Sequence, residues 1–430
     1  MKRQLLLVSL LTGLSQLAAF FKLWLTARIF GVGGDIDGYY LALIGPALVS
    51  GVIGGVIQTG LFPIRAQLAA RHNQTQVDQF ERAVFWGCNW IGLIFSLVIF
   101  LSSGLLTDIF ARSAPPQTQQ AFLLTITICS SLVWLNIASD CLSYLLAFRN
   151  KFAYAAGATI LNGAAGSLII ALLQNHGVFA LAASTIIGAS IQLLIIAAGL
   201  VSLGFPLAVK VKLTEACHSL LTVLKAGGWI VPGVVFSNLI VFLPPIWASS
   251  FGEGAVSAFN YAYRLHSSIV QLLVMASSTI LLARLSELHA AGDVKAIKKL
   301  ILQSAYISTV LGLLIVLATW GLGAPTLELV FGGKFDMAAA QRVADTWVYL
   351  SLGLGFVLFG NVVSKLWQAQ GRPKLMTVMA ATSLGLVMCL QWALNTSLGE
   401  SSIPIALSMM AAVNVLVGLR FLGLSIPQCK

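Results

Sequence analysis

The chain has 430 residues, of which 58% are hydrophobic and only 9% are charged, and its formal net charge is +11. A soluble domain carries about 25% charged residues, so this composition excludes a water-soluble globular protein. Apolar runs of about 20 residues recur along the sequence, and each is long enough to cross a hydrocarbon core of about 30 Å as a helix. We therefore expect an all-α integral membrane protein. The positive-inside rule accounts for most of the basic excess, so no nucleic-acid partner is implied.

The N-terminal half is predicted to form a first six-helix bundle over residues 1–204. Its first apolar run continues past Lys22 without a convincing cleavage site, so we interpret it as an uncleaved helix rather than a secretory signal. The stretch 63–83 contains three arginines and is expected to be a cytoplasmic loop. The six predicted transmembrane helices cover residues 5–27, 39–62, 84–106, 121–148, 152–173 and 179–203.

The C-terminal half is predicted to form a second six-helix bundle over residues 221–430, joined to the first by a cytoplasmic linker at 205–220. Of the 25 Lys and Arg residues, 16 fall in predicted inner loops or termini and four in outer loops, which places both termini in the cytoplasm. The predicted helices of this half cover residues 221–249, 258–282, 300–322, 343–368, 375–394 and 403–424.

The two halves are predicted to be copies of one unit. The segment 27–46 returns in altered form at 248–267, where Phe251, Gly252 and Tyr261 take the places of Phe30, Gly31 and Tyr40. A repeat at half the chain length indicates a duplicated structural unit. In membrane transporters, a working site commonly lies between such halves. We therefore expect about 12 transmembrane helices in two pseudo-symmetric six-helix bundles.

Charged residues inside predicted helices are the candidate functional residues, because a charge at membrane depth is costly and usually faces a cavity or a partner. Lys22 either lines a cavity or snorkels to the interface. Arg264 either binds an anion or pairs with a carboxylate such as Asp37, which is also placed to cap a helix. Asp140 is either a proton or cation site or an internal hydrogen-bonded residue, and His266 lies two residues after Arg264.

No motif for catalysis or metal binding is found. The sequence lacks Walker A, HExxH and GxSxG arrangements, and no loop is long enough for a catalytic domain. The six cysteines show no CxxC or Cys/His ligand spacing, so small buried residues are the better interpretation of most of them. We expect a protein that is not an enzyme, with no catalytic residues, no metal and no cofactor.

Several segments resemble one known family. Ala27–Gly31 followed by Asp37 and Pro46 resembles the first-loop signature of MurJ/MviN-type lipid II flippases, and Tyr261–Leu265 resembles their eighth helix. Residues 152–162 and 331–335 are similar to further segments. That family belongs to the multidrug/oligosaccharidyl-lipid/polysaccharide (MOP) exporter superfamily. The resemblance implies two bundles around a central cavity, and alternating access that moves undecaprenyl-pyrophosphate-linked saccharides.

The resemblance also implies which residues bind substrate. Arg264 matches a cavity arginine that the family needs, and Lys22 falls where the family has another arginine. Arg28 is a third candidate cation for the phosphates, while Asp140, Asp37 and His266 are candidates for coupling or gating. Two departures stand out. Gln16 and Ser50 occupy positions where the family carries arginines, and the family has two further helices beyond the twelve predicted here.

We therefore expect a flippase of the bacterial inner membrane for a lipid-linked saccharide, either lipid II-like or a surface-polysaccharide repeat unit. Coupling to membrane potential or to a monovalent ion is compatible with this interpretation. The expected partners are the lipid-linked substrate, membrane lipids and cell-envelope biosynthesis proteins. The alternative is a cation-coupled multidrug exporter of the same superfamily, which predicts an acidic site in the N-terminal half.

Overall fold

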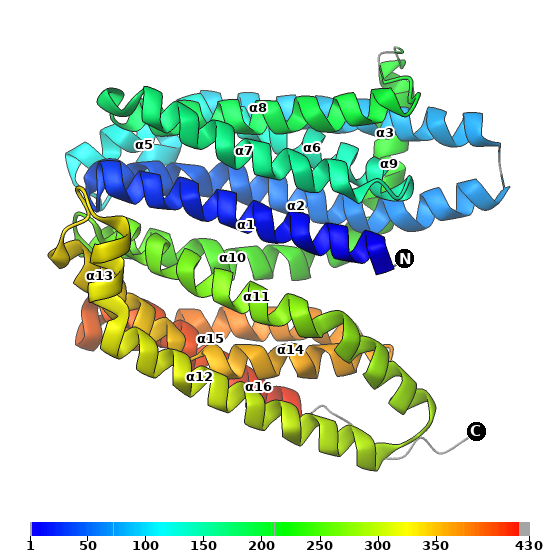
Figure 1. Cartoon of the computed structure of the whole chain (residues 1–430). Coiled ribbons are helices and arrows are strands. Elements are labelled where there is room, and N and C mark those ends of the chain that lie inside the picture. Colours follow the sequence, from blue (N-terminus) through cyan, green and yellow to red (C-terminus); the bar gives the residue numbers. More distant parts are fainter. Residues whose placement is uncertain (1, 72, 208, 210, 373, 421–430) are drawn as a thin grey trace. The chain divides into compact units, whose positions relative to one another are not determined.

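The computed structural model describes residues 2–71, 73–207, 209, 211–372 and 374–420; within its helices the side chains of 2–9, 275–280 and 374 are not described. The C-terminus, which was predicted to be cytoplasmic, lies outside the described residues. The part described is all-helical and contains no strand (Figure 1). Its helices group into two compact units, of which unit 1 comprises residues up to Asn238 together with Gly252–Gly254, and unit 2 comprises Leu239–Phe251 and the residues from Ala255 onward.

The helices of unit 1 include the six predicted spans of the N-terminal half, and α10 continues from unit 1 into unit 2 after Asn238. Their bounds are α1 (Lys2–Phe30), α2 (Gly34–Arg71), α3 (Gln74–Leu101), α4 (Ser103–Phe110), α5 (Pro116–Cys129), α6 (Leu132–Phe148), α7 (Phe152–Leu172), α8 (Val178–Ser202), α9 (Leu213–Gly227) and α10 (Val231–Ala248). The remaining helices, all in unit 2, are α11 (Ala255–Ala290), α12 (Val294–Phe331), α13 (Met337–Ser351), α14 (Leu354–Ala369), α15 (Lys374–Leu398) and α16 (Ser402–Arg420).

The helix starts confirm the internal repeat. Helix α2 begins at residue 34 and α11 at residue 255, a difference of 221 positions, and α5 and α13 begin at 116 and 337, again 221 apart. The glycines that precede α2 and α11 are also equivalent, because Gly31 and Gly252 both adopt positive φ, of 70° and 88°. Glycine populates this left-handed conformation without the steric cost of a Cβ atom.

Each unit contains one span that is broken in the middle. Helices α5 and α6 meet at an angle of 44°, and α13 and α14 meet at 41°. At the first break the hydroxyls of Ser130 and Ser131 donate to carbonyls three residues earlier, which competes with the helical ladder. At the second break Gly353 lets α14 approach α16, because a Cβ there would lie 2.8 Å from Cα of Ser408.

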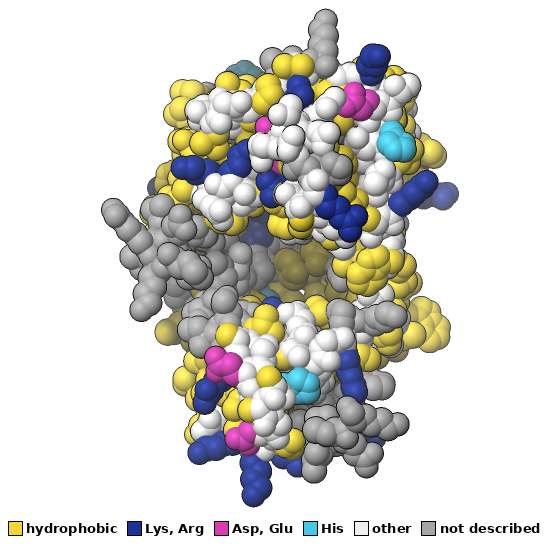
Figure 2. Space-filling view, turned by 90° about the vertical axis from the view of Figure 1, so that its right-hand side faces the viewer, with side chains coloured by type: hydrophobic (Ala, Val, Ile, Leu, Met, Phe, Trp, Pro, Cys, Tyr) yellow, Lys and Arg dark blue, Asp and Glu magenta, His cyan; other side chains and the backbone are white. Residues whose placement is uncertain are grey.

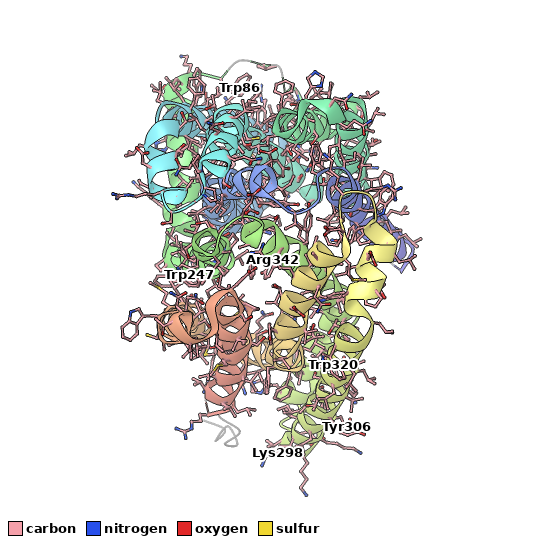
Figure 3. The ribbon with its side chains drawn as sticks, turned by 90° about the vertical axis from the view of Figure 1, so that its left-hand side faces the viewer. Trp86, Trp247, Lys298, Tyr306, Trp320 and Arg342 are labelled. Atoms are coloured by element: carbon pink, nitrogen blue, oxygen red, sulfur yellow. The ribbon has the colours of Figure 1, made fainter. Side chains whose placement is uncertain are left out.

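The described helices are long and apolar enough for a membrane protein. Eight of them could cross a bilayer, or up to ten if each bent pair is one span. Among these candidate spans, Leu375–Arg420 is counted once although it contains both α15 and α16, and α11 is not included. The number of twelve transmembrane helices therefore stays a prediction. Large side chains that would be buried in a soluble protein are exposed on α12, where Tyr306 is 73% and Trp320 77% accessible (Figure 3). Such a surface suits contact with lipid.

The predicted cytoplasmic loops are shorter than expected, because the helices extend beyond the apolar runs. Only two residues separate α2 from α3, and three separate α11 from α12. Basic side chains gather over these ends in each unit, as Figure 2 shows in dark blue. Exposed examples are Arg71 in unit 1 and Arg284, Lys295 and Lys298 in unit 2. The orientation of these ends toward the cytoplasm stays a prediction.

Residues 213–220, assigned to the linker from the sequence, belong to helix α9. This helix packs on α2 and α3 through glycines that allow backbone contact. A Cβ at Gly60 of α2 would collide with the carbonyl oxygen of Val223, and a Cβ at Gly227 would collide with that of Val56. Small residues that let backbones approach are the usual means of helix association in membranes.

Candidate functional site

Lys22 lies inside unit 1. Its ammonium donates to the hydroxyl of Thr185 on α8 at 3.4 Å, and the same hydroxyl is 2.7 Å from that of Tyr39 on α2. Because Thr185 also donates to the carbonyl of Leu181, the tyrosine hydroxyl is the donor in the second contact. The stem of Lys22 runs along Gly166 of α7, where a Cβ would lie 3.0 Å from Nζ. The side chain of Lys22 therefore points from α1 toward α7 and α8 and does not extend along the surface of α1.

Arg28 occupies a different setting, at the exposed end of α1. Its guanidinium lies 5.4 Å from the ring centroid of Trp24, within the range of a cation–π contact. As the basic residue of the last helical turn, it also interacts favourably with the negative end of the helix dipole. These contacts explain the position of Arg28 without a ligand, so its role toward phosphate stays a prediction.

Asp37 is buried, with 1% of its surface exposed, and its carboxylate accepts a hydrogen bond from the amide of Gly254 at 2.6 Å. In return the carboxylate of Glu253 accepts from the amide of Gly34, in the first turn of α2, at 2.9 Å. The two carboxylates thus each cap a backbone amide at the start of a helix, where negative charge is stabilised. This reciprocal cap joins the two copies of the repeated loop within unit 1.

Arg264 and His266 belong to unit 2, on α11. The side chain of Arg264 is exposed, whereas His266 is only 8% accessible. His266 lines a cavity of about 180 Å³ together with Tyr263, Ser267 and Ser408. The unit therefore places an imidazole and three hydroxyl groups around one small cavity.

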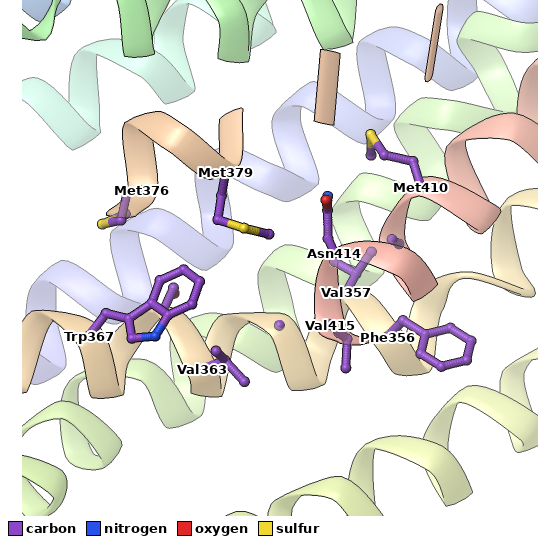
Figure 4. Close-up of a pocket in the computed structure, with 12 residues that line it drawn as sticks. Phe356, Val357, Val363, Trp367, Met376, Met379, Met410, Asn414 and Val415 are labelled. Carbon is purple, nitrogen blue, oxygen red and sulfur yellow. The ribbon is translucent and has the colours of Figure 1, made fainter. Parts of the chain in front are cut away.

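A second cavity of unit 2 was not predicted from the sequence. It measures about 260 Å³ and lies between α14, α15 and α16, where Trp367, Met376, Met379 and Met410 surround it (Figure 4). Met410 also lines the cavity of His266, so the two cavities adjoin. Flexible methionines and an indole ring favour an apolar occupant such as a hydrocarbon chain. No periodic signal in the sequence marks these residues apart from the ordinary core of a helix bundle.

An ionic cluster that the sequence does not predict lies at the predicted cytoplasmic end of unit 1. Glu81 of α3 is completely buried and contacts Arg65 of α2 at 3.1 Å and Arg149, just after α6, at 2.7 Å. Arg149 contacts Asp78 as well, at 3.1 Å. Glu81 falls within 63–83, which the sequence predicts to be a cytoplasmic loop, and its polar composition gives no sign that α2, α3 and the end of α6 meet there.

Comparisons with known proteins agree with this architecture. The sequence model of the family described as "Lipid II flippase MurJ" matches residues 26–427. The chain belongs to the MurJ lipid II flippase family. A relative from Burkholderia cenocepacia, named "Lipid II flippase MurJ", is 26% identical over 443 residues, covering 98% of this chain and 83% of its own length.

Two solved structures show the same fold as this member of the MurJ family. The inward closed conformation of lipid II flippase MurJ superposes with a TM-score of 0.82 at 18% identity, covering 96% of this chain and 87% of that one. An inward-facing multidrug resistance MATE transporter of the MOP superfamily gives a TM-score of 0.73 at 15% identity, covering 97% and 96%. The predicted MOP-exporter fold and MurJ/MviN family are thus confirmed.

Of the six residues predicted for the site, Lys22, Arg28, Asp37 and Asp140 lie in unit 1, whereas Arg264 and His266 lie in unit 2. Within unit 1, Lys22 and Asp140 point into the helix packing, while Arg28 does not. Their roles toward a substrate stay predictions.

Proposed function

We propose that the protein is a flippase that moves an undecaprenyl-(pyro)phosphate-linked saccharide across the cytoplasmic membrane by alternating access. The family match over residues 26–427 is the observation that carries this proposal. The relatives are named lipid II flippases, so lipid II is the first substrate to test. The orientation proposed is the one expected from the sequence, with both termini in the cytoplasm.

In the proposed mechanism the phosphate-bearing headgroup enters from the cytoplasmic side, and Arg264 and Lys22 bind its phosphates. A phosphate that leaves water loses its hydration, which two cations and their hydrogen bonds replace. The guanidinium of Arg264 supplies a planar fork for phosphate, whereas the Lys22 ammonium acts as a point charge. Movement of the two halves then exposes the headgroup to the outside, while the prenyl tail stays in the bilayer.

The position of Lys22 supports this proposal. Its ammonium donates to the neutral hydroxyl of Thr185 and lies beside Gly166, which places a positive charge within the helix packing where it can attract the phosphate of an incoming lipid. The same arrangement disfavours a cationic drug as the ligand, because like charges in a poorly hydrated site repel.

The proposal is tested by flipping assays with purified protein in liposomes. Lipid II and an undecaprenyl-pyrophosphate lipid carrying neutral sugars are compared for the wild type, Arg264→Ala and Lys22→Ala. Lys365→Ala is the matched control, because its ammonium is bonded to Gln368 near the end of α14. Each site variant is expected to lower flipping at least tenfold, while the control stays within twofold. Unchanged flipping in Arg264→Ala would overturn the phosphate role.

A further inference from the structure

Asp140 lies midway along α6 in unit 1, in the candidate membrane span that α5 and α6 form together. It precedes the last residue of α6, Phe148, by eight positions, which corresponds to about 12 Å along the helix axis. Among the described residues no hydrogen bond or ion pair reaches its carboxylate. A charge at this depth without a partner is expensive and marks a functional group by default. Glu81 is paired with two arginines, whereas the contacts described so far give Asp140 no role.

The carboxylate lies against the backbone of α2. A Cβ at Gly54 would lie 2.9 Å from Oδ2 of Asp140, so the glycine is what allows the close approach. One turn later on α6, the hydroxyl of Tyr144 donates to the carbonyl of Gly54 at 3.3 Å. One turn earlier, the amide of Asn136 donates to the hydroxyl of Ser50 at 3.4 Å. Three polar groups of α6 therefore face one glycine- and serine-containing stripe of α2.

No positive charge neutralises Asp140 from the helices packed against α6, which are α2, α3, α7 and α8. Helix α2 carries no charged residue between Asp37 and Arg65, α8 carries no titratable residue, and α7 carries only a tyrosine. On α6 the titratable groups that interact with Asp140 are Cys141 and Tyr144, which are neutral and supply no positive charge. The charged residues of α3 are otherwise engaged, because Glu81 is paired with Arg65 and Arg149, and Arg82 donates to the carbonyl of Asp78.

The ligand that fits this setting is a proton rather than a metal ion. In the part of the chain that is described, no group of three or more His, Cys, Asp and Glu side chains surrounds a common point. The hydroxyl of Tyr144 and the amide of Asn136 are already engaged with α2. A single carboxylate in poorly hydrated surroundings loses its charge at the lowest cost by binding a proton.

The helices that meet at Asp140 are built to bend. Helix α2 contains Pro46 and Pro63, and α6 is the second half of a span bent by 44°. Asn238 of α10 reaches the same stripe, because its Oδ1 would lie 3.0 Å from a Cβ at Gly51. It is also the last residue of α10 in unit 1, after which the helix continues into unit 2. A change of charge at Asp140 thus acts on a stripe of α2 that contacts both α6, in the bent span, and α10.

We propose that Asp140 is a proton-binding site that couples a proton to the transport cycle. The protonated carboxyl is neutral and stabilises the contact between α6 and α2, whereas the carboxylate draws in water and favours their separation. One proton binds to a carboxylate oxygen from one aqueous phase and leaves to the other, with no other bond formed or broken. A proton that binds Asp140 more tightly when α6 and α2 are in contact shifts the equilibrium toward that state. The coupling role rests on the proposed function, but the proton site does not.

The first test needs no substrate. Infrared difference spectra of the purified wild type between pH 4 and pH 9 are expected to contain a carboxyl C=O band from a poorly hydrated site. Asp140→Asn should lack that band, whereas Glu287→Gln, which changes an exposed carboxylate, should keep it. Gly54→Ala retains the carboxyl and should shift the midpoint of the band by at least half a pH unit. A wild type without the band, or a band that persists in Asp140→Asn, would overturn the proposal.

The second test measures coupling. Flipping by the wild type in liposomes is expected to change at least threefold with an imposed pH gradient at zero membrane potential, and Asp140→Asn should abolish that dependence. Asp140→Glu, which keeps a carboxyl group, should retain part of it. If flipping follows a sodium gradient at constant pH instead, the proton assignment is wrong. If the band titrates but no lipid moves, the proposed function fails while the proton site stands.

Discussion

Replacing Glu81 by glutamine should strongly destabilise unit 1. The carboxylate is fully buried between the guanidinium groups of Arg65 and Arg149, at 3.1 and 2.7 Å. In the variant the two arginines, whose side chains are only 20% and 17% accessible, face each other with less compensating charge. Breaking a buried ion pair by removing one partner costs about 3–5 kcal/mol, because the remaining charge is left without compensation. The remaining contact between Arg149 and Asp78 places the expected loss at the lower end of this range.

The assay is thermal unfolding in detergent, followed by tryptophan fluorescence. A loss of 3–5 kcal/mol corresponds to a fall of about 6–20 °C in Tm, at about 2–4 °C per kcal/mol for a unit of this size. The matched control is Glu287→Gln, whose side chain is 68% accessible and paired with an exposed arginine. An exposed pair contributes at most about 1 kcal/mol, so the control should lose no more than about 4 °C. Equal losses in the two variants would refute the reasoning.

Three further substitutions test the packing and the polar contacts. Gly60→Ala should lower stability by about 1–3 kcal/mol, because its Cβ would collide with a carbonyl of α9, whereas Gly104→Ala, with no neighbour within 4 Å, should not. Thr185→Val should reduce flipping about two- to tenfold by removing one hydrogen bond to the lysine of α1, and Thr127→Val, at an exposed site, should leave flipping unchanged. Asp37→Ala should lower thermal stability by about 1.5–3 kcal/mol, measured as a shift in Tm, because a buried amide loses a charged acceptor; a shift below one degree would contradict the cap.

Apolar length and charge were enough to predict the helices, because each run must satisfy its own backbone in lipid. The repeat could also be predicted from the sequence, because both copies keep the glycine that the left-handed turn requires, at Gly31 and Gly252. The two bends could not be predicted, because the apolar run continues through each of them. The serine hydroxyls lie at the first bend and Gly353 lies at the second, and neither interrupts the run. Similarly, residues 213–220 of α9 were predicted as part of the linker because the stretch carries charged residues, whereas their burial comes from packing against α2 and α3.

Some residues of the candidate site could be predicted from the sequence and others could not. Lys22 and Asp140 could be singled out because charge at membrane depth is rare. Their partners could not, since Thr185 and Gly54 are ordinary helix residues until folding places them beside these charges. Glu81 was missed for the opposite reason. A carboxylate in a polar stretch predicts solvent exposure, and only the tertiary contact of α2, α3 and the end of α6 buries it.

The central claim is that the protein carries a phosphate-bearing headgroup across the membrane. The most direct measurement compares two prenyl lipids with the same saccharide in liposomes containing the wild type, one linked through pyrophosphate and the other through a neutral glycosidic bond. We expect the pyrophosphate lipid to cross at least tenfold faster than in protein-free liposomes, and the neutral lipid to cross no faster than it does without protein. Equal movement of both lipids, or movement of neither, would contradict it.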